Sequence, residues 1–267
     1  MSAIDALFAQ LRRDGRKALM PFITAGDPDL DFTRELLCQL VACGCALCEL
    51  GIPYSDPVAD GPVIQDSYTR ALDRKIKLDA ILAMLAGLTP QLAAPLVTMV
   101  SYAIIYRRGL ERYVADAQQA GVAGAIVPDL PVEEAGPLAD VCRRADFSLI
   151  QLITPTTPRE RALRIAEQTS GFIYYVSVTG ITGERTAIPP QVLDNVAWLR
   201  GQTPLPICIG FGISRAEHVR MLRPVADGLI VGSAIVRRLA DAASKPRETV
   251  LAEIGQYVAE LIAALEE

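Results

Sequence analysis

The stretch Cys48–Gln65 reads CELGIPYSDPVADGPVIQ, and the interpretation of the whole chain starts from it. Its first residues continue an apolar run that predicts a buried strand, and this strand delivers the carboxylate of Glu49 to its end. A loop with three prolines follows and carries Asp56 and Asp60. Proline fixes φ and glycine relieves steric limits, so such a loop holds one unusual shape with few alternatives. Carboxylates held at a strand end by a stiff loop are typical of α/β enzymes, so we interpret Glu49 and Asp60 as the reacting pair.

Apolar runs recur along the chain on both sides of this stretch, and helical segments separate them. Strands are predicted at 17–24, 46–49, 95–102, 123–131, 147–154, 172–177, 206–209 and 228–231. Helices are predicted at 3–13, 31–43, 63–72, 78–87, 109–120, from Glu133, from near Pro158, at 190–200 and at 248–265. Continuous rather than alternating apolar strands indicate a parallel sheet that is buried on both faces. The sequence therefore predicts an α/β fold, a (β/α)8 TIM barrel, with an extra N-terminal helix and a short helix in the loop after strand 2. No linker interrupts the pattern, so we expect one barrel domain over residues 1–267.

Composition excludes several classes of protein. The chain has 267 residues, 51% of them hydrophobic and 6% aromatic, which fits a large aliphatic core. Its net charge of -5 contains no large basic block, so nucleic acid and anionic membranes are not expected partners. No run reaches the roughly 18 apolar residues of a spanning helix, and the N-terminus lacks the order of a signal peptide. We expect a soluble, cytoplasmic protein.

Cysteine and histidine usage argues against a metal site. A zinc or iron–sulfur site at Cys43, Cys45 and Cys48 is the alternative, but a separation of three in a strand turns Cys45 and Cys48 to opposite faces. The remaining cysteines lie in apolar sequence, where a thiol behaves as a small hydrophobe; they are Cys38, Cys142 and Cys208. The only histidine, His218, lies in an amphipathic stretch and is interpreted as a helix surface residue. We expect no metal.

Glycine-rich turns follow the last three predicted strands. They are Gly180–Gly183, Gly210–Gly212 and Gly232–Ser233. Backbone amides in such turns form a concave anion site, which in barrels is commonly a phosphate site near strands 7 and 8; ordinary tight turns are the alternative. Arg185 and Arg215 add little positive charge, so amides would provide most of the binding.

The reacting pair and the anion site together predict general acid–base chemistry on a phosphorylated small molecule. Solvated loop carboxylates are the bland alternative, although an unpaired charge that continues an apolar strand is costly. Asp56 could equally cap a turn before Pro57. None of the four lysines stands at a strand end, which argues against a Schiff-base aldolase.

The stretch Glu49–Gln65 resembles the signature of the tryptophan synthase α subunit family. Further matches stand in the same order along nearly the whole chain: PFITAGDP (21–28), VPDLPVEE (127–134), GITGER (180–185), IGFGIS (209–214) and DGLIVGSAIV (227–236). The resemblance implies a (β/α)8 barrel that cleaves indole-3-glycerol phosphate to indole and glyceraldehyde 3-phosphate in tryptophan biosynthesis. It also implies no cofactor in this chain and a partner, the β subunit with its pyridoxal phosphate, in an α2β2 heterotetramer.

The resemblance also assigns roles to individual residues. Glu49 would transfer protons and Asp60 would bind the indole N–H, although the division of proton transfers between them stays open. The phosphate would be bound by Gly183, Gly212, Gly232 and Ser233. The residues that line or support the pocket would be Phe22, Ile64, Tyr174 and Thr182.

Partner contacts are expected at Asp56 and Ile104. The family commonly has asparagine where Ile104 stands, so we expect a more apolar docking face here, formed with Ile105. Three alternatives remain from the sequence: a different phosphate-binding barrel enzyme, a stand-alone indole-3-glycerol-phosphate lyase, and a non-catalytic regulatory subunit of the same fold.

Overall fold

A computed structural model of the chain describes residues 2–57, 60–176, 190–210 and 212–267. Its strands form one parallel sheet in the order β5-β4-β3-β2-β1-β9-β8-β7-β6. Their bounds are β1 Ala18–Thr24, β2 Cys48–Gly51, β3 Leu96–Met99, β4 Gly124–Ile126, β5 Ser148–Ile150, β6 Leu152–Ile153, β7 Ile173–Val176, β8 Ile207–Gly210 and β9 Gly228–Val231. All the paired strands are parallel, as the continuous apolar runs predict.

The two ends of this sheet meet at Gln151. This single residue separates β5, which pairs with β4, from β6, which pairs with β7. The predicted strand 147–154 therefore serves both neighbours, and eight predicted runs give nine strand segments. The sheet returns on itself, which confirms the predicted barrel.

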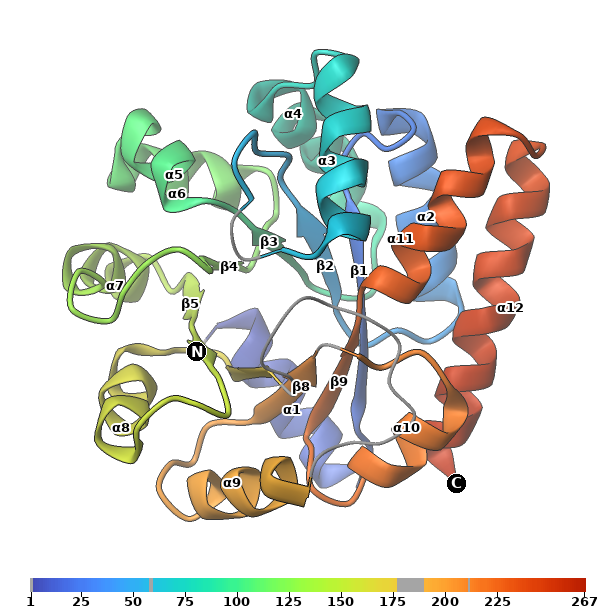
Figure 1. Cartoon of the computed structure of the whole chain (residues 1–267). Helices are drawn as coiled ribbons and strands as arrows, with labels where there is room; N and C mark the ends of the chain where they lie inside the picture. The colour runs from blue at the N-terminus through green and yellow to red at the C-terminus, as the bar shows by residue number, and fades with distance from the viewer. Residues whose placement is uncertain (1, 58–59, 177–189, 211) are drawn as a thin grey trace.

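Helices surround the strands on the outside of the barrel (Figure 1). Their bounds are α1 Ala3–Arg13, α2 Leu30–Ala42, α3 Pro62–Asp73, α4 Leu78–Leu88, α5 Tyr102–Arg108, α6 Leu110–Gln119, α7 Gly136–Arg144, α8 Arg159–Gln168, α9 Pro190–Arg200, α10 Ala216–Leu222, α11 Ser233–Leu239 and α12 Arg247–Glu266. Short 3-10 turns lie at η1 Thr89–Gln91 and η2 Ala240–Ala243. The predicted extra helices are α1, which a capping box at Ser2 begins, and α3, which begins after Gly61 with proline in its first turn.

Two segments between β3 and α7 differ from the prediction. Helix α5 begins soon after β3 and was not predicted. Ser101 caps it by accepting a hydrogen bond from the Ala103 amide, and Asp129 accepts hydrogen bonds from the Ser101 hydroxyl and the Tyr102 amide. The predicted helix start at Glu133 is wrong, since α7 begins at Gly136 after a turn. The Glu133 carboxylate instead forms a two-bond ion pair with Arg161 of α8.

Burial corrects two further predictions. Cys38 is exposed, because α2 turns Leu36, Leu37 and Leu40 inward and leaves Cys38 toward solvent. His218 was predicted on the surface, but only 5% of it is exposed. Cys45, Cys48, Cys142 and Cys208 are buried, as predicted.

Neither a metal cluster nor a membrane span is found in the part of the chain that the structure describes. No group of three or more histidine, cysteine, aspartate and glutamate residues there could hold a metal ion. None of the described helices is both long and apolar enough to cross a membrane.

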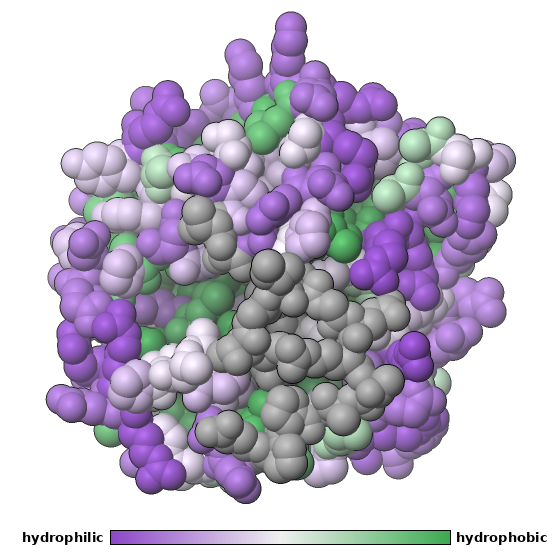
Figure 2. All heavy atoms as spheres, viewed as in Figure 1, coloured by the Kyte–Doolittle hydropathy of each residue, from purple (hydrophilic) through white to green (hydrophobic). Residues whose placement is uncertain are grey.

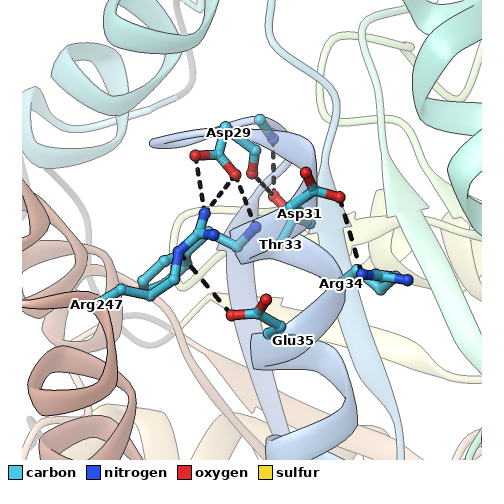
Figure 3. A network of polar contacts seen from close by, with 8 residues as sticks. Asp29, Asp31, Thr33, Arg34, Glu35 and Arg247 are labelled. Carbon is cyan, nitrogen blue, oxygen red and sulfur yellow. Dashed lines mark hydrogen bonds and ion pairs between the residues drawn. The ribbon is translucent and has the colours of Figure 1, made fainter.

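The last helix is fastened to the second at their N-terminal ends (Figure 3). Asp29 caps α2 by accepting a hydrogen bond from the Phe32 amide, and the same carboxylate receives the Arg247 guanidinium of α12. Arg247 also lies 5.2 Å from the centre of the Phe32 ring. This contact holds α12 against α2, and α12 also packs on β1.

Candidate active site

A pocket with an empty volume of about 700 Å³ opens at the C-terminal ends of the strands. Every predicted catalytic, pocket and phosphate residue that the structure describes lines it: Phe22, Glu49, Asp60, Ile64, Tyr174, Gly212, Gly232 and Ser233. Gly183 and Thr182 lie outside the described residues. In Figure 2 the outer part of this face is mostly hydrophilic, and apolar side chains are visible in a recess nearer its middle. The sequence therefore predicted which distant segments meet here.

Glu49 lies inside the barrel with none of its surface exposed. It is the second residue of β2, paired with Phe22 of β1 and Val97 of β3, so its predicted place at the strand end is wrong by two residues. Neither carboxyl oxygen has a hydrogen-bond partner among the described residues. Burial, with a smaller effect from Asp60, raises the pKa of Glu49 well above its ordinary value. This rise shifts the equilibrium of Glu49 toward its neutral, protonated form.

Asp60 lies just before α3 and faces the same pocket as Glu49. Its amide donates to the Pro57 carbonyl at 3.1 Å, and its own carbonyl accepts from the Gln65 side chain at 2.7 Å. Burial, followed by the charge of Asp129, raises the pKa of Asp60 to about 6. A pKa of about 6 leaves most Asp60 ionised at pH 7, whereas the raised pKa of Glu49 favours its protonated form. Two carboxyls with different environments can take an acid role and a charge-stabilising role in one site.

A buried hydroxyl pair fixes α3 against β1 and thereby helps to place Asp60 and Ile64. Thr24 and Ser67 lie 2.6 Å apart through their hydroxyl oxygens, and Ser67 donates to the Ile64 carbonyl at 2.7 Å. Ile64 is itself 6% exposed and forms part of the pocket wall. These bonds hold the beginning of α3 in place, close to the loop that carries Asp60.

Two glycines make room for the aromatic side chains of the pocket. A Cβ on Gly51 would lie 2.5 Å from Cζ of Phe22, and one on Gly210 would lie 2.5 Å from the Tyr174 hydroxyl. Both approaches are closer than real Cβ atoms allow, so these positions require glycine.

Tyr174 is the second residue of β7, so its predicted place at the end of the strand is wrong. Its side chain is buried and lines the pocket. Burial, followed by the charges of Glu49 and Asp60, raises the pKa of Tyr174. The hydroxyl therefore keeps its proton near the two carboxyls.

The opposite wall of the pocket carries the predicted anion-binding turns. Gly212 has φ 79°, a left-handed conformation that favours glycine, whereas Gly232 has φ -109° and directly precedes α11. Sequence reasoning missed Arg237, an exposed cation that also lines this pocket. The signal was present, because Arg237 stands four residues after Ser233 and so shares a helix face with it. The cations named from the sequence are not found here: Arg185 lies outside the described residues, and Arg215 is not among the described residues of the wall.

A second cavity with an empty volume of about 340 Å³ adjoins the first, because Asp60 lines both. Asp56 lies in its wall together with Asp129, which the sequence analysis did not single out although the matched motif VPDLPVEE contains it. Asp56 is therefore close to the site loop without lining the main pocket.

Helix α5 presents one large apolar side chain to solvent. Ile104 is partly buried, and Tyr106 is 71% exposed. Ile105 is fully buried, so the prediction that it contributes to a docking face is wrong; it packs inward from the helix instead. Residue type alone does not show that the side chain of Tyr106, and not that of Ile105, is the exposed one.

Comparison with known proteins adds independent support for the resemblance. The family model described as tryptophan synthase alpha chain matches residues 8–265. A protein of Rhodopirellula baltica with that description is 56% identical over 100% of this chain and 99% of its own length. Another from Synechococcus is 46% identical over 97% and 96% of the two chains.

Solved structures agree with this result. A tryptophan synthase subunit alpha of Legionella pneumophila has a TM-score of 0.91 and 34% identity, covering 100% of this chain and 99% of that one. A Pyrococcus furiosus structure, titled for the tryptophan synthase α2β2 complex, has a TM-score of 0.86 and 36% identity over 93% and 99% of the two chains. The pocket, the motifs that line it and these full-length matches agree: this chain belongs to the tryptophan synthase alpha chain family.

Proposed function

We propose that this chain is a carbon–carbon lyase, the α subunit of a tryptophan synthase, and that it cleaves indole-3-glycerol phosphate to indole and glyceraldehyde 3-phosphate. The observation that carries the proposal is the pair of carboxyls at one apolar pocket. Glu49 is fully buried with a raised pKa, and Asp60 has a pKa near 6. The family match gives this pair its substrate.

The proposed cleavage is a retro-aldol reaction that begins with a proton. Glu49, in its protonated form, donates a proton to C3 of the indole ring, and the positive charge spreads to the ring nitrogen. The Asp60 carboxylate accepts a hydrogen bond from the ring N–H and stabilises that charge. The C3–C3′ bond then breaks, its electron pair restores the aromatic ring, and ionised Glu49 takes the proton of the C3′ hydroxyl as the aldehyde forms. One acid thus gives and regains one proton, which suits a buried group with a raised pKa.

The remaining pocket residues are proposed to bind and orient the substrate. Phe22 and Ile64 offer apolar contact to the indole ring, and the protonated Tyr174 hydroxyl supports Glu49. Gly212, Gly232 and Ser233 would bind the phosphate through amides and a hydroxyl, with Arg237 adding a positive charge. Two further roles rest on the resemblance alone: Gly183 is proposed to bind the phosphate, and Thr182 is proposed to close over the site.

The proposed partner is the β subunit. The similar Pyrococcus furiosus structure is titled for an α2β2 complex, and an α2β2 assembly is proposed for this chain on that similarity. Asp56 and Ile104 are the proposed contact residues, joined by the exposed Tyr106. We further propose that the chain forms one barrel domain. We also propose that it acts in tryptophan biosynthesis in the cytoplasm.

Indole release tests this proposal directly. Purified protein is mixed with indole-3-glycerol phosphate, and indole is measured by chromatography. Release of indole in equal amount to glyceraldehyde 3-phosphate is expected. No indole release, with or without a β subunit, would contradict the proposal and favour a regulatory subunit or an enzyme for another phosphorylated substrate.

A further inference from the structure

We propose that His218 is a positioning residue for phosphate binding, and that it acts by fixing Ser214 in the turn between β8 and α10. The inference rests on the phosphate site of the proposed function, because the same turn forms one wall of that site. Gly212, Ile213 and Ser214 all line the main pocket, whereas His218 is not among the described residues of its wall.

The contact is a hydrogen bond from backbone to side chain within a buried corner. The Ser214 amide donates to Nδ1 of His218 at 3.3 Å. A nitrogen that accepts a hydrogen bond carries no proton, so the neutral imidazole with its proton on Nε2 is the form that fits. His218 is 5% exposed, which shields this bond from water.

A second helix, α12, binds the backbone carbonyl of Ser214. The Tyr257 hydroxyl of α12 donates to the Ser214 carbonyl at 3.0 Å. The Arg238 guanidinium lies 3.7 Å from the centre of the Tyr257 ring and donates to the Ala234 carbonyl of α11. Both backbone polar groups of Ser214 are thus bound by side chains, and the chain of contacts ends on the helix that begins at Ser233.

This arrangement has a consequence for the anion site. The Ser214 amide is engaged by His218 and is not offered to a ligand, while the turn from Gly212 to Ser214 is held in place. Gly212 has φ 79° and, as a glycine, can adopt several backbone conformations. The bonds that hold Ser214, two residues later, restrict this conformational freedom. The Ser214 hydroxyl is itself buried and has no hydrogen-bond partner among the described residues, so the backbone bonds provide the anchoring. Losing the acceptor at residue 218 is expected to loosen the turn and weaken binding of the phosphate end of a ligand.

The test compares ligands with and without a phosphate. Calorimetry measures Kd for glycerol 3-phosphate and for indole with the wild type, His218→Leu, His218→Asn and Tyr257→Phe. Leucine keeps apolar bulk but has no acceptor, whereas the Asn Oδ1 occupies nearly the place of Nδ1. Thr169→Val is the matched control: it removes a buried side-chain bond to the Ile165 carbonyl, in α8 and away from the pocket.

His218→Leu is expected to weaken glycerol 3-phosphate binding about tenfold, the effect of one lost hydrogen bond, and to leave indole binding within about twofold. His218→Asn should return affinity to within about threefold of the wild type, and Thr169→Val should change neither ligand. With indole-3-glycerol phosphate, His218→Leu should raise KM and leave kcat nearly unchanged. If His218→Leu does not fold, Tyr257→Phe, which retains the ring under Arg238, should still weaken glycerol 3-phosphate about threefold and leave indole unaffected.

Unchanged affinity for glycerol 3-phosphate in folded His218→Leu, or equal weakening of both ligands without rescue by asparagine, would overturn the inference. Absence of glycerol 3-phosphate binding in the wild type would overturn it as well. The proposed reaction fails separately: a wild type that binds glycerol 3-phosphate with this dependence on residue 218, yet releases no indole, retains the phosphate site and loses the proposed substrate.

Discussion

The buried carboxyl of Glu49 lowers the stability of the folded protein when it is ionised. Its carboxyl is fully buried, and its pKa is raised chiefly by burial. A folded-state pKa above the unfolded one means that the folded protein binds the proton more tightly. The free energy of unfolding therefore falls as pH rises from the unfolded pKa toward the folded one.

Glu49→Gln removes this titration and so changes the pH dependence of stability. Relative to the wild type, the variant should gain unfolding free energy as the pH rises above 4.5, because it lacks the carboxyl whose raised folded-state pKa lowers stability there. Urea unfolding at pH 4.5 and at pH 7 measures the gain. Parallel stability curves for the two proteins would show that Glu49 titrates as an ordinary carboxyl.

Asp60 should set the acid limb of the activity profile. In the proposed mechanism its carboxylate must be ionised to stabilise the ring N–H. The ratio kcat/KM, which reports the pKa values of the free enzyme, should therefore rise with pH through about pH 6 and fall again where Glu49 loses its proton. Because the charge of Asp129 raises the pKa of Asp60, Asp129→Asn should move the acid limb to lower pH. A limb that stays in place in this variant would contradict the assignment.

Much of the site could be predicted from the sequence, since residues far apart in the chain lie on parallel strands or in the segments that follow them. His218 and Ile105 show where such reasoning stops. Each has a residue type compatible with either the surface or the core, and only the packing of neighbouring elements decides between them. Arg237 was missed for a different reason: the matched motif ends at Val236, and the four-residue spacing of Arg237 from Ser233 was not considered.

At the scale of elements, the two turns proposed to bind phosphate differ in the residues that they tolerate. A Cβ on Gly232 would meet Phe22 at 3.5 Å, an ordinary contact, and its φ of -109° suits any residue. Gly212 has φ 79°, where a side chain is strained. Gly232→Ala should therefore keep wild-type stability, whereas Gly212→Ala should lose about 1 kcal/mol.

Gly232→Val then tests whether the phosphate of the ligand must approach the backbone closely at this residue. It should raise KM for indole-3-glycerol phosphate and leave the fold intact, as steady-state kinetics and thermal unfolding would show. An unchanged KM would place the phosphate elsewhere. Gly212→Val gives a less clear result, since strain and lost binding act together.

Strand positions were more predictable than helix starts. A continuous apolar run such as 228–231 has few other uses, and β9 has those bounds. Helix α5 begins at a local Ser101 cap, which the predicted strand at 95–102 included. Asp129, 28 residues later, adds hydrogen bonds that no local pattern shows.

At the scale of the whole molecule, the loop after β2 contributes to both cavities. Asp60 lines both of them, and Asp56 lines the second together with Asp129, which accepts a hydrogen bond from the Tyr102 amide at the start of α5. We expect a low rate of indole release from the isolated chain and an increase when its cognate β subunit binds. Asp56→Ala should weaken that increase more than it lowers the basal rate. Full activity alone, with no complex on a sizing column, would show a self-sufficient enzyme.

The central claim is that Glu49 and Asp60 cleave indole-3-glycerol phosphate, and the most direct test is kcat for indole release by Glu49→Gln and Asp60→Asn. Both changes are nearly isosteric, so circular dichroism should match the wild type. Each variant should lose at least about a hundredfold in kcat, the low end for general acid–base catalysis. Retention of more than about a tenth of wild-type turnover by either folded variant would contradict the claim.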